Sequence, residues 1–168
     1  EDKIRALGKL GYLPIEIKAV QEGDIIANKN VLMTITNTLP EFYWVVGFVE
    51  SLLLKLWYPI TVATGCLAYR EVVEAAFADT VDEDMYFLKD FTVHDFGYRG
   101  DTSEEGAGIS GAAHLLSFAG SDTVPAFPFV VKHYGADKKG LIMASVPASE
   151  HSVMCSFGRD GELDAYKN

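Results

Sequence analysis

Strands alternate with helices along the second half of the chain, and this order constrains the fold more than any other feature. Side chains of 91–96 alternate between two faces with period two, and 141–146 is a second, more apolar strand candidate. A helix is expected from Thr102 towards Phe118, and another over 128–134. Because strands that alternate with helices form βαβ units, we expect an α/β fold with a partly parallel sheet.

The first forty residues favour β structure instead. Residues 13–20 alternate between apolar and polar side chains, 21–24 form a turn, and 31–36 continue as a second strand. We therefore expect a β-rich segment over 1–40. Residues 41–168 are expected to form the part of the chain that is built from helices and strands.

The most apolar window of the chain covers 42–58. It is interrupted by Gly47, Glu50, Ser51 and Lys55, and so falls short of the roughly 20 apolar residues that a membrane span needs. We expect a buried helix here that is cut at Pro59, where a proline removes a helical hydrogen bond. A second helix is expected over 60–77.

Composition excludes several classes of partner. The chain has 168 residues and a net charge of −10, whereas nucleic acids and anionic membranes attract a basic surface, so we expect neither as a partner. A hydrophobic content of 49% is sufficient for a real core. Cys66 and Cys155 lie far apart in the sequence, which argues against a disulfide framework and favours a reducing, cytoplasmic location.

The sequence matches one familiar motif, a dinucleotide-binding pattern that we reject, and lacks another, the spacing of a metal site. Gly106–Gly111 matches G-x-G-x-x-G, but it lies inside a helix that a Thr102–Glu105 capping box starts, so small residues for close helix packing explain it better than a dinucleotide. The histidines lack the i,i+4 pairing of a zinc helix, and the cysteines lack metal-ligand spacing. We therefore expect no metal site built from these side chains.

Three short segments combine chemically useful side chains: 94–100, 120–124 and 145–152. Each lies at or just beyond the end of an expected strand, so in an α/β barrel all three would meet on one face. Taken alone, each has an ordinary explanation: a buried Phe and a surface Arg at a turn, an Asp that caps a turn, and a histidine without a special role.

These segments read His-Asp-Phe-Gly-Tyr-Arg-Gly, Gly-Ser-Asp-Thr-Val and Ser-Val-Pro-Ala-Ser-Glu-His-Ser. In this form they resemble the nicotinamide phosphoribosyltransferase family, a group of type II phosphoribosyltransferases of NAD salvage. Residues 13–20 and 57–64 also look like that family, so the resemblance covers nearly the whole chain. It implies that the chain is part of an irregular α/β barrel with a mainly β segment at its start.

The resemblance implies a specific reaction. The family transfers the phosphoribosyl group of phosphoribosyl pyrophosphate to the ring nitrogen of nicotinamide, which gives nicotinamide mononucleotide and pyrophosphate. It implies Mg²⁺, which accompanies phosphoribosyl pyrophosphate and is held mostly by parts outside this chain, and ATP as a phosphoryl donor. It also implies a cytoplasmic homodimer.

Residue by residue, the resemblance implies a base-binding group. Phe96 matches the aromatic on which the pyridine ring stacks, and Arg99 matches a substrate-binding arginine. Asp122 matches the carboxylate that accepts a hydrogen bond from the carboxamide. The wall of the tunnel to the nicotinamide pocket is matched by Ser145, Val146 and Ala148.

The same resemblance implies a catalytic pair. His151 matches the histidine that the family phosphorylates from ATP. Glu150 stands beside it, and a carboxylate that is hydrogen-bonded to the imidazole would fix its tautomer and raise its nucleophilicity.

Two alternatives remain open from the sequence. One is a nicotinate-specific relative, which Asp122 disfavours because nicotinate would bring a second carboxylate against it. The other is a non-catalytic fragment or assembly module, because the family's later phosphate-binding segment and its N-terminal aromatic have no counterpart in these residues.

Overall fold

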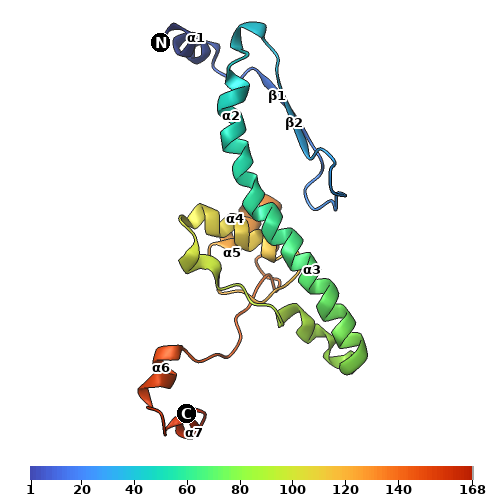
Figure 1. The fold of residues 1–168 in the computed structure, drawn as a ribbon, viewed down its shortest axis with the longest axis vertical. Coiled ribbons are helices and arrows are strands. Elements are labelled where there is room, and N and C mark those ends of the chain that lie inside the picture. Colours follow the sequence, from blue (N-terminus) through green and yellow to red (C-terminus); the bar gives the residue numbers. More distant parts are fainter. Residues whose placement is uncertain (168) are drawn as a thin grey trace. The chain divides into compact units, whose positions relative to one another are not determined.

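The computed structural model describes residues 1–167 and contains both helices and strands (Figure 1). This mixture is compatible with the expected α/β class. The chain divides into two compact units, residues 1–64 and the residues from Gly65 onward. Each unit is described by itself below.

The first unit contains the expected β structure. Strand β1 (Ile15–Ala19) pairs antiparallel with β2 (Met33–Asn37), and Ile17 lies opposite Ile35. Helix α1 (Asp2–Leu10) precedes them and was not expected from the sequence. This helix ends at Gly11, whose φ of 78° is the left-handed conformation that glycine adopts at low cost.

A short 3-10 turn, η1 (Pro40–Phe42), leads into a run of helices: α2 (Val45–Leu53), η2 (Leu54–Leu56) and α3 (Trp57–Thr80). The predicted break at Pro59 is wrong. Pro59 lies in the first turn of α3, directly after the 3-10 turn η2, which is the part of an α-helix where proline is best tolerated.

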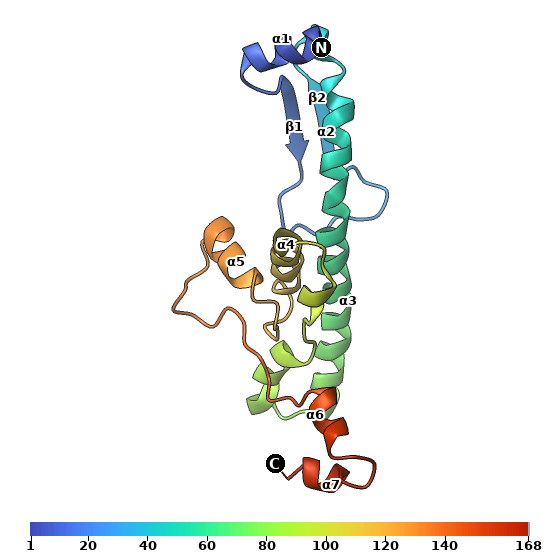
Figure 2. The ribbon, with the colours of Figure 1, turned by 90° about the vertical axis from the view of Figure 1, so that its left-hand side faces the viewer.

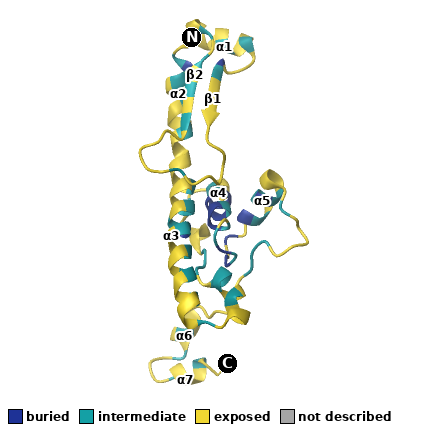
Figure 3. Cartoon of the chain, turned by 90° about the vertical axis from the view of Figure 1, so that its right-hand side faces the viewer, coloured by how far each residue is buried: buried dark blue, intermediate teal, exposed yellow. Residues whose placement is uncertain are grey.

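The prediction of a buried helix is also wrong. In α2 only Val45 is buried, and most side chains of the helical run are exposed (Figure 3). By length and composition the run Val45–Thr80 is apolar enough to cross a membrane, and 6% of its most apolar window is buried. A single helix of this kind is weak evidence for a membrane protein.

The second unit is built around two helices that lie side by side, α4 (Glu104–His114) and α5 (Ala126–Tyr134) (Figure 2). They carry most of its buried residues (Figure 3). The remaining elements of this unit are η3 (Glu83–Phe91), η4 (Gly97–Gly100), α6 (His151–Ser156) and α7 (Glu162–Ala165).

The expected strands over 91–96 and 141–146 do not form as strands. Each is reduced to one residue in a parallel bridge, Asp95 with Ser121 and Ala144 with Gly120. Thr92 shows why the first strand is short, because its amide and its hydroxyl both donate to the Lys89 carbonyl. Such local bonds compete with a strand ladder and extend the 3-10 turn of η3 instead.

Helix α4 starts one residue later than expected. Ser103, not Thr102, is its N-cap, and its hydroxyl accepts the Gly106 amide at 3.0 Å. The glycines of the G-x-G-x-x-G sequence do lie inside this helix. A Cβ atom at Gly108 would lie 3.2 Å from the Pro125 carbonyl oxygen, so close packing against α5 explains the small residues, as predicted.

Replacing Gly111 by alanine is expected to destabilise the second unit. The added Cβ would lie 2.6 Å from Cβ of Ala126 and 3.0 Å from Cγ2 of Thr123, so α4 and α5 would have to separate. Overpacking costs roughly 1–3 kcal/mol, whereas alanine gains at most about 1 kcal/mol over glycine in a helix. We expect a lower midpoint of thermal unfolding, measured by circular dichroism.

The matched control is Gly65→Ala in α3, where an added Cβ meets nothing within 4 Å apart from its own helix. This variant is expected to keep or raise the unfolding midpoint. Equal midpoints for the two variants would contradict the packing explanation.

Candidate functional site

The three segments singled out in the sequence begin side by side. The Asp95 amide donates to the Gly120 carbonyl at 3.1 Å, and the Asp122 amide donates to the Asp95 carbonyl at 2.9 Å. The Ser121 amide donates to the Ala144 carbonyl at 3.1 Å. The three segments therefore meet at their first residues, although the strands expected before them are reduced to isolated bridges.

Asp122 is the centre of this junction. Nε2 of His94 lies 3.0 Å from its Oδ2, and Ser145 also hydrogen-bonds to it. The Ser145 hydroxyl and then the His94 ring lower the pKa of Asp122, and outweigh the opposite effect of desolvation. Asp122 is therefore an ionised, 46% exposed carboxylate at neutral pH.

Phe96 is connected to this carboxylate through His94, and its ring lies largely in solvent. The side chain is 61% exposed, so the ordinary explanation of a buried Phe does not apply. Its ring centroid lies 4.6 Å from that of His94, with 36° between the planes. An exposed aromatic face beside an ionised acceptor can bind a flat ring that carries a hydrogen-bond donor.

The sequence analysis did not select His94. It precedes Phe96 by two residues, and this spacing places both on one face of an extended segment, which was the available signal. The His94 side chain is 8% exposed, and its Nδ1 is buried with no hydrogen-bond partner in the part of the chain that the structure describes. Nε2 is therefore best assigned as the protonated nitrogen that donates to Asp122.

Arg99 lies in η4, the turn that follows Phe96. Oδ1 of Asp95 accepts the Gly97 amide at 2.7 Å and starts this turn. The Arg99 side chain is exposed, and among residues 1–167 it forms no ion pair with a carboxylate. Its guanidinium is available for an anion.

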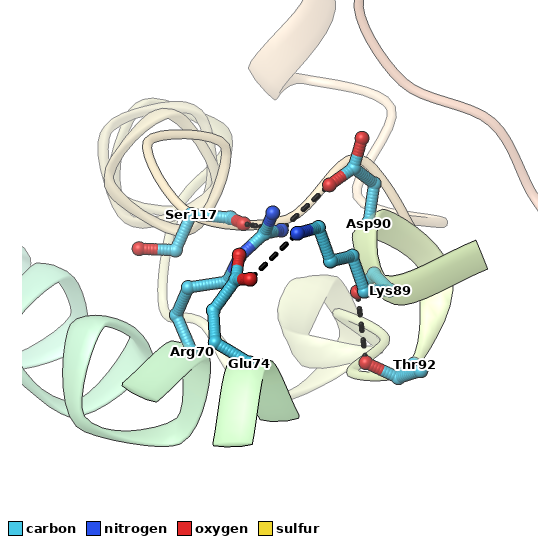
Figure 4. Close-up of polar contacts among 6 residues, drawn as sticks. All are labelled: Arg70, Glu74, Lys89, Asp90, Thr92 and Ser117. Atoms are coloured by element: carbon cyan, nitrogen blue, oxygen red, sulfur yellow. Dashed lines mark hydrogen bonds and ion pairs between the residues drawn. The ribbon is translucent and has the colours of Figure 1, made fainter. Parts of the chain in front are cut away.

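An ion-pair cluster joins α3 to η3 (Figure 4). Arg70 of α3 donates to Glu74 at 2.7 Å, to Asp90 at 2.6 Å and to the carbonyl of Ser117 at 3.0 Å. Lys89 donates to Glu74 at 2.6 Å. The carbonyl of Asp90 accepts the amides of residues 119 and 120, so this cluster connects α3 to the strand end before Asp122.

Hydrogen bonds within the cluster shift the pKa values of Glu74 and Arg70. Hydrogen bonds from Lys89 and then Arg70 lower the pKa of Glu74. Desolvation opposes the charge of Arg70, but hydrogen bonds to Asp90 and Glu74 raise its pKa. Glu74 and Arg70 are therefore charged at neutral pH.

The catalytic pair expected from the sequence lies at the start of α6. Glu150 is the N-cap, and its carboxylate accepts the amide and the hydroxyl of Ser152, which lower its pKa. His151 is the first residue of the helix and is exposed. Within residues 1–167, no hydrogen bond or ion pair joins His151 to Glu150 or to Asp122.

The residues expected to line the tunnel do not all lie at the junction around Asp122. Ser145 reaches Asp122, and its hydroxyl also lies 3.5 Å from the Val146 carbonyl. Val146 is half-buried and Ala148 is exposed. The structure thus gathers Phe96, Asp122 and Ser145 into one group, with Arg99 on the turn that follows it.

The segment that contains the junction matches a known protein family. Residues 91–168 match the Nicotinate phosphoribosyltransferase (NAPRTase) family, and they include every residue of the junction. The junction therefore lies in a segment typical of phosphoribosyltransferases that act on a pyridine base.

The chain is also similar to proteins named nicotinamide phosphoribosyltransferase. It is 44% identical over 158 residues to that of Xanthomonas campestris pv. campestris (strain 8004), covering 94% of this chain and 33% of the relative. It is 36% identical over 169 residues to that of Acinetobacter baylyi, covering 99% and 32%. The relative from Mycoplasma pneumoniae is 33% identical over 159 residues, covering 92% and 32%. These matches confirm the resemblance, and the chain spans about a third of the length of these relatives.

Glu74→Gln is expected to make the free energy of unfolding depend less on pH in the acid range. A carboxyl whose pKa is lowered in the folded state contributes stability above its unfolded pKa, and loses it as pH falls through the folded value. The gap in unfolding free energy between the unsubstituted chain and Glu74→Gln should be largest at neutral pH and should close at acid pH, as measured by urea unfolding.

Glu71→Gln is the control, since Glu71 is an exposed carboxylate on the same helix. It is expected to leave the profile unchanged. A gap for Glu74→Gln that stays constant with pH would show that its charge does not stabilise the fold.

Proposed function

We propose that this chain forms the base-binding part of a nicotinamide phosphoribosyltransferase. The complete enzyme would transfer the phosphoribosyl group of phosphoribosyl pyrophosphate to nicotinamide, with release of pyrophosphate. The observation that carries the proposal is the ionised carboxylate of Asp122 and the exposed ring of Phe96, which both contact the His94 ring, within a segment that matches the nicotinate phosphoribosyltransferase family.

Each side chain would meet a different part of nicotinamide. The pyridine ring stacks on Phe96, which is worth roughly 0.5–1.5 kcal/mol beyond the burial of area. The carboxamide NH₂ donates to Asp122, because an ionised carboxylate accepts hydrogen bonds and donates none. His94 and Ser145 use part of the accepting capacity of Asp122 and hold the carboxylate in place.

The same carboxylate separates nicotinamide from nicotinate. The matched family is named for nicotinate, whereas the relatives are named for nicotinamide. Nicotinate would bring a second negative charge against Asp122, whose own charge is stabilised by Ser145 and His94 rather than neutralised by a lysine or arginine. A nicotinate enzyme is the second candidate, and the family description supports it.

The other roles complete the proposal. Arg99 binds an anionic group of the phosphoribosyl donor, and Ser145, Val146 and Ala148 line the approach to the base. His151 accepts a phosphoryl group from ATP. Glu150 influences that histidine through its charge, because its hydrogen bonds go to Ser152.

Residues 1–167 contain no group of three His, Cys, Asp or Glu side chains that could hold a metal ion. We therefore assign Mg²⁺ to the pyrophosphate of the donor and derive no step through it. The barrel, the homodimer and the cytoplasmic location implied by the resemblance are part of the same proposal. Helix α2 carries exposed apolar side chains, such as Phe48 and Leu52, which supports the proposal that another part of the assembled protein covers them.

An assay for nicotinamide mononucleotide tests the proposal. The chain is mixed with nicotinamide, phosphoribosyl pyrophosphate and Mg²⁺, with and without ATP, and with and without the remaining segments of the Xanthomonas campestris relative. We expect product when those segments are present, and more product with ATP. Assembly without product in any arm would favour the non-catalytic module instead.

Asp122→Asn is expected to relax the preference for nicotinamide in the assembled enzyme. The substitution keeps the size of the side chain and removes its charge, so the repulsion of nicotinate is lost. We expect the ratio of kcat/KM for nicotinamide to that for nicotinate to fall roughly tenfold or more.

Asp160→Asn is the charge-matched control, because Asp160 lies in the turn between α6 and α7. It is expected to leave the ratio unchanged. An unchanged ratio for Asp122→Asn would remove Asp122 from the explanation of specificity.

A further inference from the structure

A buried pair of side chains, Cys66 of α3 and His114 of α4, has no part in the function proposed above. Both are almost completely buried, at 7% and 4% exposure. Sγ of Cys66 lies 3.5 Å from Nδ1 of His114, and Nε2 of His114 lies 2.9 Å from the Gly120 carbonyl oxygen. The pair is therefore hydrogen-bonded to Gly120, which precedes Asp122 by two residues.

The protons of this pair follow from its partners. A carbonyl oxygen can only accept, so Nε2 of His114 carries the hydrogen and Nδ1 accepts from the Cys66 thiol. Burial raises the pKa of Cys66 and lowers that of His114, which keeps both groups neutral in this arrangement. The thiol is thus a buried donor rather than a nucleophile.

We propose that His114 is a positioning residue, which holds the Gly120 carbonyl so that Phe96 and Asp122 lie in register for the base. The Gly120 carbonyl accepts two hydrogen bonds, one from His114 and one from the Asp95 amide. The second of these is the parallel pairing that brings Phe96, the next residue, to the junction.

A second contact carries the effect to Asp122. A Cβ atom at Gly120 would lie 2.9 Å from Nδ1 of His94, so the His94 ring rests against the backbone of residue 120. The opposite nitrogen of that ring pairs with Asp122. Displacing Gly120 therefore displaces His94, and with it the orientation of the carboxylate. Phe118, which packs on the His114 ring at 5.8 Å between centroids, limits other positions for that ring.

Two substitutions of His114 separate its hydrogen bond from its packing. His114→Phe keeps a planar ring and removes both nitrogens, so the Gly120 carbonyl loses one donor. His114→Gln retains an N–H donor near the position of Nε2. Val130→Ala, a cavity in the buried face of α5, is the control for a general loss of stability.

Amide hydrogen exchange in the chain itself is the first measurement. In His114→Phe we expect the amides of Asp95 and Asp122 to exchange roughly five- to tenfold faster relative to those of α5. His114→Gln should restore rates close to those of the unsubstituted chain, and Val130→Ala should not change the ratio. If His114→Phe does not fold, Cys66→Ala against Cys66→Ser applies the same comparison to the thiol donor, with the same expected direction.

The second measurement rests on the proposed function and uses the assembled enzyme. His114→Phe should raise the KM for nicotinamide several-fold with a smaller change in kcat and in the KM for phosphoribosyl pyrophosphate, and His114→Gln should reverse this. Unchanged exchange at Asp95 and Asp122, or an equal effect of Val130→Ala, would overturn the positioning role. An unsubstituted enzyme that does not use nicotinamide would overturn the proposed function alone, because the exchange measurement still decides the role of His114.

Discussion

The junction of strand ends depends on the close approach of other groups to residue 120. An added Cβ at Gly120 would lie 2.9 Å from Nδ1 of His94 and 3.3 Å from the Val93 carbonyl oxygen, so the adjacent segment could not approach a larger residue. The Gly120 amide donates a hydrogen bond to the Asp90 carbonyl. The Gly120 carbonyl accepts hydrogen bonds from the Asp95 amide and from the His114 ring. The spacing between His94 and Asp122 follows from this packing.

The charge of the candidate site is set locally and not by the net charge of −10. In the ion-pair cluster, Arg70 and Lys89 pair with Glu74 and Asp90, so these carboxylates are balanced by cations. Asp122 differs, because its hydrogen bonds come from a hydroxyl and an imidazole. It stays ionised without a lysine or arginine partner in residues 1–167. Such a carboxylate favours a neutral amide over a second, negatively charged carboxylate.

The sequence was sufficient for the features that local pattern determines. The junction was predicted because strand ends gather at one edge of an α/β fold, and the packing glycines because small residues inside a capped helix indicate close contact with a neighbouring element. The partners of His94 and His114 could not be predicted, since they lie 28 and 48 residues away in the sequence. The strand predicted over 91–96 is reduced to a single bridge at Asp95 because Thr92 bonds locally to Lys89, a choice that alternation of side chains does not reveal.

The junction presents its aromatic ring and its carboxylate to solvent. Phe96 is 61% exposed and offers an aromatic face, and Asp122 offers an acceptor that is 46% exposed. A nicotinamide on this platform would keep its other face and its ring nitrogen uncovered by the contacts that the junction supplies. A base bound only on one side gains little against the entropy of its own immobilisation. In the proposed enzyme, tight binding and phosphoribosyl transfer would therefore require further groups on the uncovered face of the base.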